Sequence, residues 1–139
     1  MPTRSAYDYA VIRVVPRVER EEFVNVGVIL SCPGRDFLDA RLHLDRQRLL
    51  ALDPTLDFQL LEQHLRIIPL VCSGDPTAGP IAKLTPRQRF HWLIAPRSTI
   101  IQTSVAHSGL CEEDPGASLD HLMATMVLPS AAIPGTHKE

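Results

Sequence analysis

The sequence lacks the features that mark several large classes of protein. No uninterrupted apolar run approaches the roughly 18 residues of a membrane-spanning helix, and no apolar signal core follows Met1. Fourteen Lys and Arg against sixteen Asp and Glu give a formal net charge of −2, so the basic field of a general nucleic-acid binder is absent. We therefore expect a cytoplasmic protein that binds neither membranes nor nucleic acids in general.

Motifs for metals, redox pairs and phosphate groups are also missing. The three cysteines, Cys32, Cys72 and Cys111, lack the Cys-x-x-Cys spacing of a metal or redox pair, so we expect free thiols packed as small apolar groups. The six histidines show neither His-x-His nor His-Glu-x-x-His spacing. The glycines at 74 and 79 do not open a helix as a phosphate cradle requires. We expect no metal and no cofactor.

What the sequence does contain is enough apolar material for a core. The chain has 139 residues, of which 45% are hydrophobic and 22% charged, and a chain of this length can fold on its own. No internal repeat or linker divides it. We predict one domain over residues 1–139, with a core over about 5–128 and a flexible tail over 130–139.

Three segments rich in β-branched and aromatic residues predict an antiparallel meander. They are residues 7–15, 23–30 and 37–44, with Pro16 after the first and a Cys-Pro-Gly turn before the third. Because side chains alternate along a strand, the second segment divides into a core face with Val24, Val26, Val28 and Leu30 and an outer face with Phe23, Asn25, Gly27 and Ile29.

The rest of the chain changes to helical spacing. Apolar positions predict a short helix over 49–52, a longer one over 56–71 and a closing helix over 119–127. Residues 85–88, Thr-Pro-Arg-Gln, combine a cap, a proline at the first helical position and a capping-box glutamine, so another helix begins there. Residues 99–105 predict a fourth strand. The fold class is α+β: an antiparallel sheet of about four strands with helices packed on one face, as a two-layer single domain.

Polar side chains project from the outer face of the predicted sheet. Arg13, Asn25, Arg41 and His43 fall there if the strands pair in simple register, with Arg13 and Asn25 within reach of each other. Such a face can bind an anion or a partner's carboxylates, or it can be a solvated surface. Gly27 weakens its strand and often marks a bulge or a close approach, so its place beside Asn25 favours a contact surface.

A second polar group surrounds the only tryptophan. Trp92 lies between His91 and Arg97 at a helix-to-strand corner. No acidic residue nearby in the sequence orients His91, and Ser98 lacks the Gly-x-Ser-x-Gly elbow of hydrolases. Three interpretations stay open: packing of Trp92 with Arg97 capping or salt-bridging, binding of a partner or an anion, and catalysis.

Three stretches of the sequence match a known pattern. They are residues 7–13, residues 22–28 and the run from 89 to 110. Together they resemble a bacterial domain-of-unknown-function family, number 3037, over roughly residues 5–128. The resemblance implies a small stand-alone protein without an assigned activity and, by association, a kinase-like partner similar to the HipA toxins. The matching polar or special positions are Arg13, Glu22, Asn25, Gly27, His91, Trp92, Arg97, Ser98, Gln102 and His107.

Two functional hypotheses follow. The first is a binding or regulatory module for a protein partner, such as a HipA-like kinase, because no catalytic set is recognisable. The second is a small enzyme or ligand-binding domain for a phosphorylated or nucleotide-like compound, in which Arg13 and Arg97 hold the anion and His91 or His107 moves protons. A purely structural alternative pairs Arg13 with Glu22. One deep pocket that collects these side chains favours the enzyme, and a flat patch favours the module.

Overall fold

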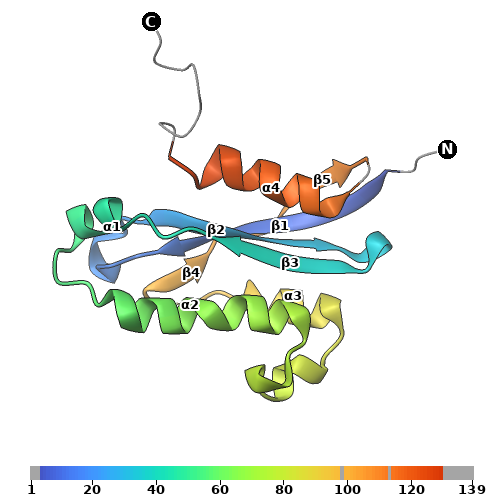
Figure 1. Ribbon diagram of the computed structural model, residues 1–139, viewed down its shortest axis with the longest axis horizontal. Helices are drawn as coiled ribbons and strands as arrows, with labels where there is room; N and C mark the ends of the chain where they lie inside the picture. The colour runs from blue at the N-terminus through green and yellow to red at the C-terminus, as the bar shows by residue number, and fades with distance from the viewer. Residues whose placement is uncertain (1–3, 98, 113, 130–139) are drawn as a thin grey trace, which may run out of the picture.

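An open, antiparallel five-stranded sheet forms the centre of the molecule (Figure 1). The computed structural model describes residues 4–97, 99–112 and 114–129, so Ser98 and the predicted tail over 130–139 lie outside the described residues. Three consecutive strands form the predicted meander, and the last two strands both pair with the first one. The strands are β1 (Ser5–Val14), β2 (Val24–Cys32), β3 (Phe37–Leu42), β4 (Ile101–Thr103) and β5 (His107–Cys111).

Each α-helix is preceded by an N-cap residue whose side chain accepts a hydrogen bond from a backbone N–H in the first turn of the helix. The caps are Asp45, Asp57, Thr85 and Asp114, and Thr85 forms the predicted capping box with Gln88. No helix within the described ranges is both long and apolar enough to cross a membrane. The α-helices are α1 (Arg46–Leu52), α2 (Phe58–Ser73), α3 (Pro86–Leu93) and α4 (Pro115–Met126), and the 3-10 helices are Val18–Arg20, Pro33–Arg35, Pro76–Ala78 and Pro80–Lys83.

The helices lie on both faces of the sheet. The predicted α+β class and antiparallel sheet are confirmed, and α2 and α3 pack together on one face (Figure 1). The closing helix, α4, lies on the opposite face, which the prediction had left uncovered (Figure 1). The reason is a second apolar cluster, which joins α4 to the far ends of β2 and β5 and contains Val28, Leu30, Cys32, Cys111, Leu119, Leu122, Met123 and Val127.

A β-bulge in β2 creates the apolar surface on which α4 packs. Ile12 lies opposite Gly27, but the next residue, Arg13, lies opposite Asn25, so Val26 is the extra residue of the bulge. An extra residue reverses the alternation of the strand beyond it. The register still places Arg13 and Asn25 side by side, as the sequence predicted.

The bulge corrects the predicted faces of β2. Val24 and Val26 belong to the cluster under α2 and α3, whereas Val28 and Leu30 belong to the cluster under α4. The prediction that all four share one face is therefore wrong. A side chain at position 27 would clash with the neighbouring strand, because a Cβ there would lie 2.4 Å from the carbonyl oxygen of Arg41. Gly27 allows a close approach of two backbones within the sheet.

All three cysteines are buried and free, as expected. The Sγ atoms of Cys32 and Cys111 lie 3.8 Å apart, although 79 residues separate them in the sequence. Both strand ends flank the start of β1, which brings these thiols together. Burial raises the pKa of Cys32, and burial raises that of Cys72, in α2, to about 12. These are the properties of packed apolar groups and not of nucleophiles.

We expect the protein to lose stability between about pH 9 and 12, and the variant Cys72→Ala to lose less. The pKa of Cys72 is raised from 9.0 to about 12, so the unfolded chain ionises first as the pH rises. This contribution is complete below pH 9 and then falls by about 1.4 kcal/mol per pH unit. Urea titrations of both proteins at about pH 8 and about pH 10 measure the difference. Equal pH dependence in the two proteins would contradict a buried thiol.

Candidate binding site

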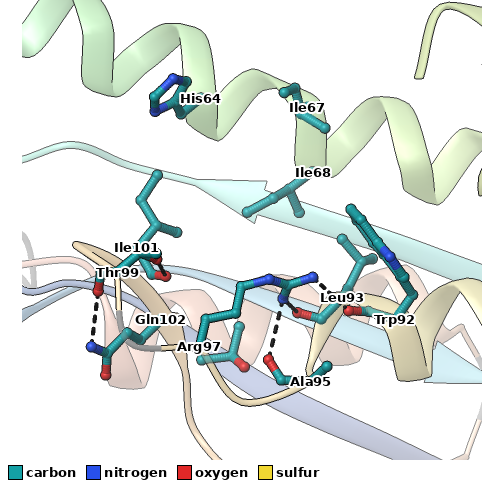
Figure 2. Close-up of a pocket in the computed structure, with 11 residues that line it drawn as sticks. His64, Ile67, Ile68, Trp92, Leu93, Ala95, Arg97, Thr99, Ile101 and Gln102 are labelled. Atoms are coloured by element: carbon teal, nitrogen blue, oxygen red, sulfur yellow. Dashed lines mark hydrogen bonds between the residues drawn. The ribbon is translucent and has the colours of Figure 1, made fainter. Parts of the chain in front are cut away.

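Arg97 fixes the corner that follows α3. Its Nη1 donates hydrogen bonds to the carbonyl oxygens of Leu93 and Ala95, at 3.1 and 3.2 Å, and its Nη2 donates to that of Trp92, at 3.0 Å (Figure 2). The guanidinium carbon also lies 4.8 Å from the centre of the Trp92 ring. A cation that binds the last carbonyls of a helix stabilises its C-terminus. The capping interpretation of Arg97 is thus confirmed.

Beside this corner is a pocket of about 220 Å³, which we call the apolar pocket (Figure 2). Side chains of α2 form one wall, and the segment from the end of α3 to β4 forms the other. Two large apolar side chains at its rim, Ile67 and Trp92, stay 43% and 39% exposed. The lining residues are His64, Ile67, Ile68, Trp92, Leu93, Ala95, Arg97, Thr99, Ile101, Gln102 and Thr103.

A second pocket, of about 320 Å³, shares a wall with the first and is called the arginine pocket. Arg97 and Gln102 line both pockets, and the register of β1 and β4 places Gln102 directly opposite Arg13. The Nε2 of Gln102 donates to the carbonyl oxygen of Thr99 at 2.8 Å, which holds the amide in place. The lining residues are Arg13, Val15, Val18, Glu21, Phe23, Arg97 and Gln102.

Arg13 lacks a hydrogen-bonding partner within the described part of the chain. Its guanidinium carbon lies 4.2 Å from the centre of the Phe23 ring. Its Nε is buried without a hydrogen-bond partner, and no carboxylate of the described residues lies within ion-pair distance of it. A buried donor without a partner costs stability and is rare in folded proteins. The positive charge of Arg13 is thus not balanced by an ion pair within the described residues.

Asn25, opposite Arg13, has a structural role. Its Nδ2 donates to the carbonyl oxygen of Met126 at 3.2 Å, so it caps the C-terminus of α4. Its Oδ1 is buried and accepts no hydrogen bond from the described residues. This amide therefore anchors α4 to the sheet beside the arginine pocket, although it does not line that pocket.

Glu22 lines neither of these two pockets. Its carboxylate pairs with Arg20 at 2.8 Å on the exposed surface, and this hydrogen bond lowers the pKa of Glu22. The alternative that Arg13 pairs with Glu22 is therefore wrong. Arg20 and Glu22 lie in the connection before β2 and pair with each other. Glu22 therefore does not neutralise Arg13, which lines the arginine pocket.

His91 lies near a separate polar network around Asp8. The carboxylate of Asp8 accepts hydrogen bonds from Arg87 and, at 2.8 Å, from Ser108, and Arg87 also donates to Ser31 at 3.0 Å. The hydrogen bond from Arg87 is the main cause that holds the pKa of Asp8 below its usual range, and the charge of His91 acts in the same direction. None of these residues lines the apolar or the arginine pocket.

His107 also lies apart from the arginines. It pairs with Tyr9 across β1 and β5, and the two rings are 5.3 Å apart. The structure therefore brings Arg13, Trp92, Arg97 and Gln102 around two joined pockets. It leaves both histidines that the second hypothesis required outside them.

The residues that α2 supplies to the apolar pocket are not evident from the sequence. His64 and Ile67 lie on its exposed side and line the apolar pocket, about 30 residues before Trp92 in the chain. No spacing in the sequence connects these positions, because only the packing of α2 against α3 brings them together. No group of three His, Cys, Asp or Glu side chains in the described ranges is arranged to hold a metal ion. The chemistry available is recognition of an anion beside an apolar group.

Comparison with known proteins identifies one family. A family model described as "Protein of unknown function (DUF3037)" matches residues 9–127, which include both pockets. No curated protein matches the sequence. No solved structure matches it either.

Proposed function

Because the chain belongs to the DUF3037 family of proteins of unknown function, we propose its function from the geometry: it is a binding module for a protein partner. The partner docks on the apolar pocket and the arginine pocket around Trp92. A kinase-like partner, which the family resemblance implies, is the finer form of the proposal.

The single observation that carries the proposal is the exposed Trp92 stacked by Arg97 at the rim of a small apolar pocket. Trp and Arg are the residues that most often dominate the binding energy of protein interfaces, especially beside a pocket that accepts an anchor side chain. Three backbone hydrogen bonds hold this Arg in place. A fixed aromatic and guanidinium pair is better suited to a partner surface than to solvent.

The enzyme hypothesis has less support. Arg13 and Arg97 line one pocket, as that hypothesis requires, but His91 and His107 lie in other parts of the molecule. A general base must reach the proton that it abstracts, directly or through one water. Among the described residues that line these two pockets the only histidine is His64, which belongs to the apolar pocket.

The proposal is tested by photo-crosslinking in cells of the natural host. The photoreactive amino acid p-benzoylphenylalanine replaces Ile67, at the rim of the apolar pocket. The control carries it at Leu110, which is exposed on β5 and lines neither pocket. We expect one protein to crosslink from position 67 and not from position 110.

The crosslinked protein is then purified and titrated with three versions of the module. We expect Trp92→Ala to weaken binding by roughly tenfold or more, the loss typical of an interface hot spot, while Val105→Ala, an exposed apolar control, binds as the unchanged protein does. Melting curves verify that both variants fold. Unchanged binding by Trp92→Ala, or no crosslink from position 67, would refute the proposed function.

A further inference from the structure

The arginine pocket has an excess of positive charge that its own residues do not neutralise. Arg13 and Arg97 both line it, and among the described residues Glu21 is its only acidic lining residue. Neither arginine forms an ion pair with a carboxylate of the described residues. The pocket therefore carries about one unbalanced positive charge in a partly desolvated setting, where a charge without a partner is costly.

Both arginines keep donors for a ligand. An arginine has five N–H donors, and the three backbone hydrogen bonds of Arg97 leave its Nε–H and one of its two Nη2–H donors. Arg13 donates to no described residue, and although its Nε is buried, its two Nη groups remain as donors for a ligand in this pocket. Two guanidinium groups with such donors match the planar, two-oxygen geometry of a carboxylate.

The apolar pocket determines which kind of group a ligand can place next to a carboxylate bound by the two arginines. Its volume of about 220 Å³ is below the roughly 300–1,000 Å³ of sites for whole small molecules, so it fits one large apolar side chain. The two pockets share Arg97 and Gln102 as a common wall. An extended chain advances about 3.3 Å per residue, so a segment that occupies both of these adjoining pockets would place its acidic and its apolar side chain close together in sequence.

From these observations, and resting on the proposed function, we propose that the partner presents a short segment with an Asp or Glu within one to three positions of a Leu, Ile, Phe or similar side chain. The carboxylate binds Arg13 and Arg97, and the apolar side chain fills the apolar pocket. A single negative charge balances the pocket, whereas a phosphate dianion would exceed its unbalanced charge.

Peptide display on the full chain tests this inference directly. A library of random peptides is selected on the unchanged protein, and peptides that also bind Trp92→Ala are discarded. We expect the remaining sequences to share the acidic and apolar pair. The best peptide is then made in three forms, with Glu, with Gln and with phosphoserine at the acidic position. Calorimetric titration should show a 10- to 100-fold weaker affinity for the Gln form, the scale of a charged hydrogen bond.

Variants of the protein assign that loss to the pocket. Arg13→Gln should weaken binding of the Glu peptide more than binding of the Gln peptide, so the difference in affinity between the two peptides should be smaller than in the unchanged protein; Arg97 keeps the remaining difference. Arg13→Lys should keep part of the affinity, because it keeps the positive charge. It should lose the rest, because an ammonium group lacks the planar pair of N–H donors of a guanidinium. Arg66→Gln, a matched control on the exposed side of α2 that lines neither pocket, should behave as the unchanged protein.

The possible failures are distinguishable. Selected peptides without an acidic residue, or an Arg13→Gln variant that weakens all three peptides equally, would overturn the carboxylate site while the proposed function stands. Tighter binding of the phosphoserine form through Arg13 would replace the carboxylate with a phosphate. Failure to select any peptide that depends on Trp92 would refute both the site and the proposed function.

Discussion

Replacement of Gly27 by alanine is expected to lower the free energy of unfolding by about 3 kcal/mol, the upper end of the range for overpacking a core. The new Cβ would lie 2.4 Å from the carbonyl oxygen of Arg41, 2.8 Å from a Leu42 methyl group and 3.0 Å from one of Ile12. The first neighbour is backbone of the paired strand β3, which cannot rotate away as a side chain can. Either β3 separates from the bulge or the bulge rearranges, and both disturb the sheet next to Arg13.

Gly34→Ala is the matched control for this prediction. It makes the same chemical change in the connection between β2 and β3, where the nearest atom to a new Cβ is the Ser5 hydroxyl at 3.6 Å, an ordinary contact. We expect its stability to stay within about 0.5 kcal/mol of the unchanged protein, as for most surface substitutions. Urea denaturation of the two variants compares them. Equal stability would mean that the backbones of β2 and β3 do not approach closely at the bulge.

The other large effect is expected from Phe90→Ala, at about 3–5 kcal/mol. Phe90 is fully buried in the cluster between the sheet, α2 and α3, and Arg87 lies over its ring at 5.3 Å. Removing the ring leaves a cavity under α3, because the sheet and the helices hold its walls in place. Loss on this scale is a large fraction of the stability of a domain of this size.

Val105→Ala serves as the control, since Val105 is 76% exposed and its truncation creates no cavity. We expect its unfolding midpoint in urea to match that of the unchanged protein. A Phe90→Ala variant that unfolds at the same urea concentration as the control would contradict the placement of α3 on the sheet.

Local signals in the sequence predicted most of the elements, whereas long-range pairing had to come from the structure. The Thr85 cap with Pro86 and Gln88 located the start of α3, because a capping box acts within one turn. The strand β5 was missed, since residues 107–111 have little β propensity and contain Gly109. A Cβ at this glycine would lie 2.6 Å from the Tyr7 ring on β1, so the ring would have to shift to accept one.

The candidate site was predicted only in part, because the sequence shows local groupings of residues but not the packing that brings distant segments together. Arg13 is predicted as a polar residue in a strand, Arg97 as one at a corner and Gln102 as a position of the family resemblance, and all three line one pocket. His91 was grouped with Trp92 because they are neighbours in sequence, but consecutive residues of a helix point about 100° apart. His91 consequently lies near Asp8 and does not line the apolar pocket. The wall of that pocket opposite Trp92 is formed by side chains of α2.

The hydrogen bonds that hold Arg97 against the end of α3 also prepare it for a ligand. A free arginine on a surface loses about 2 kcal/mol of rotamer entropy when a partner fixes it. Arg97 has lost most of that freedom on folding, because three carbonyl groups and the Trp92 ring already set its orientation. The entropy of fixing this side chain is lost on folding and not on binding. A new contact at the Arg97 guanidinium therefore contributes more to affinity than the same contact at a free surface arginine would.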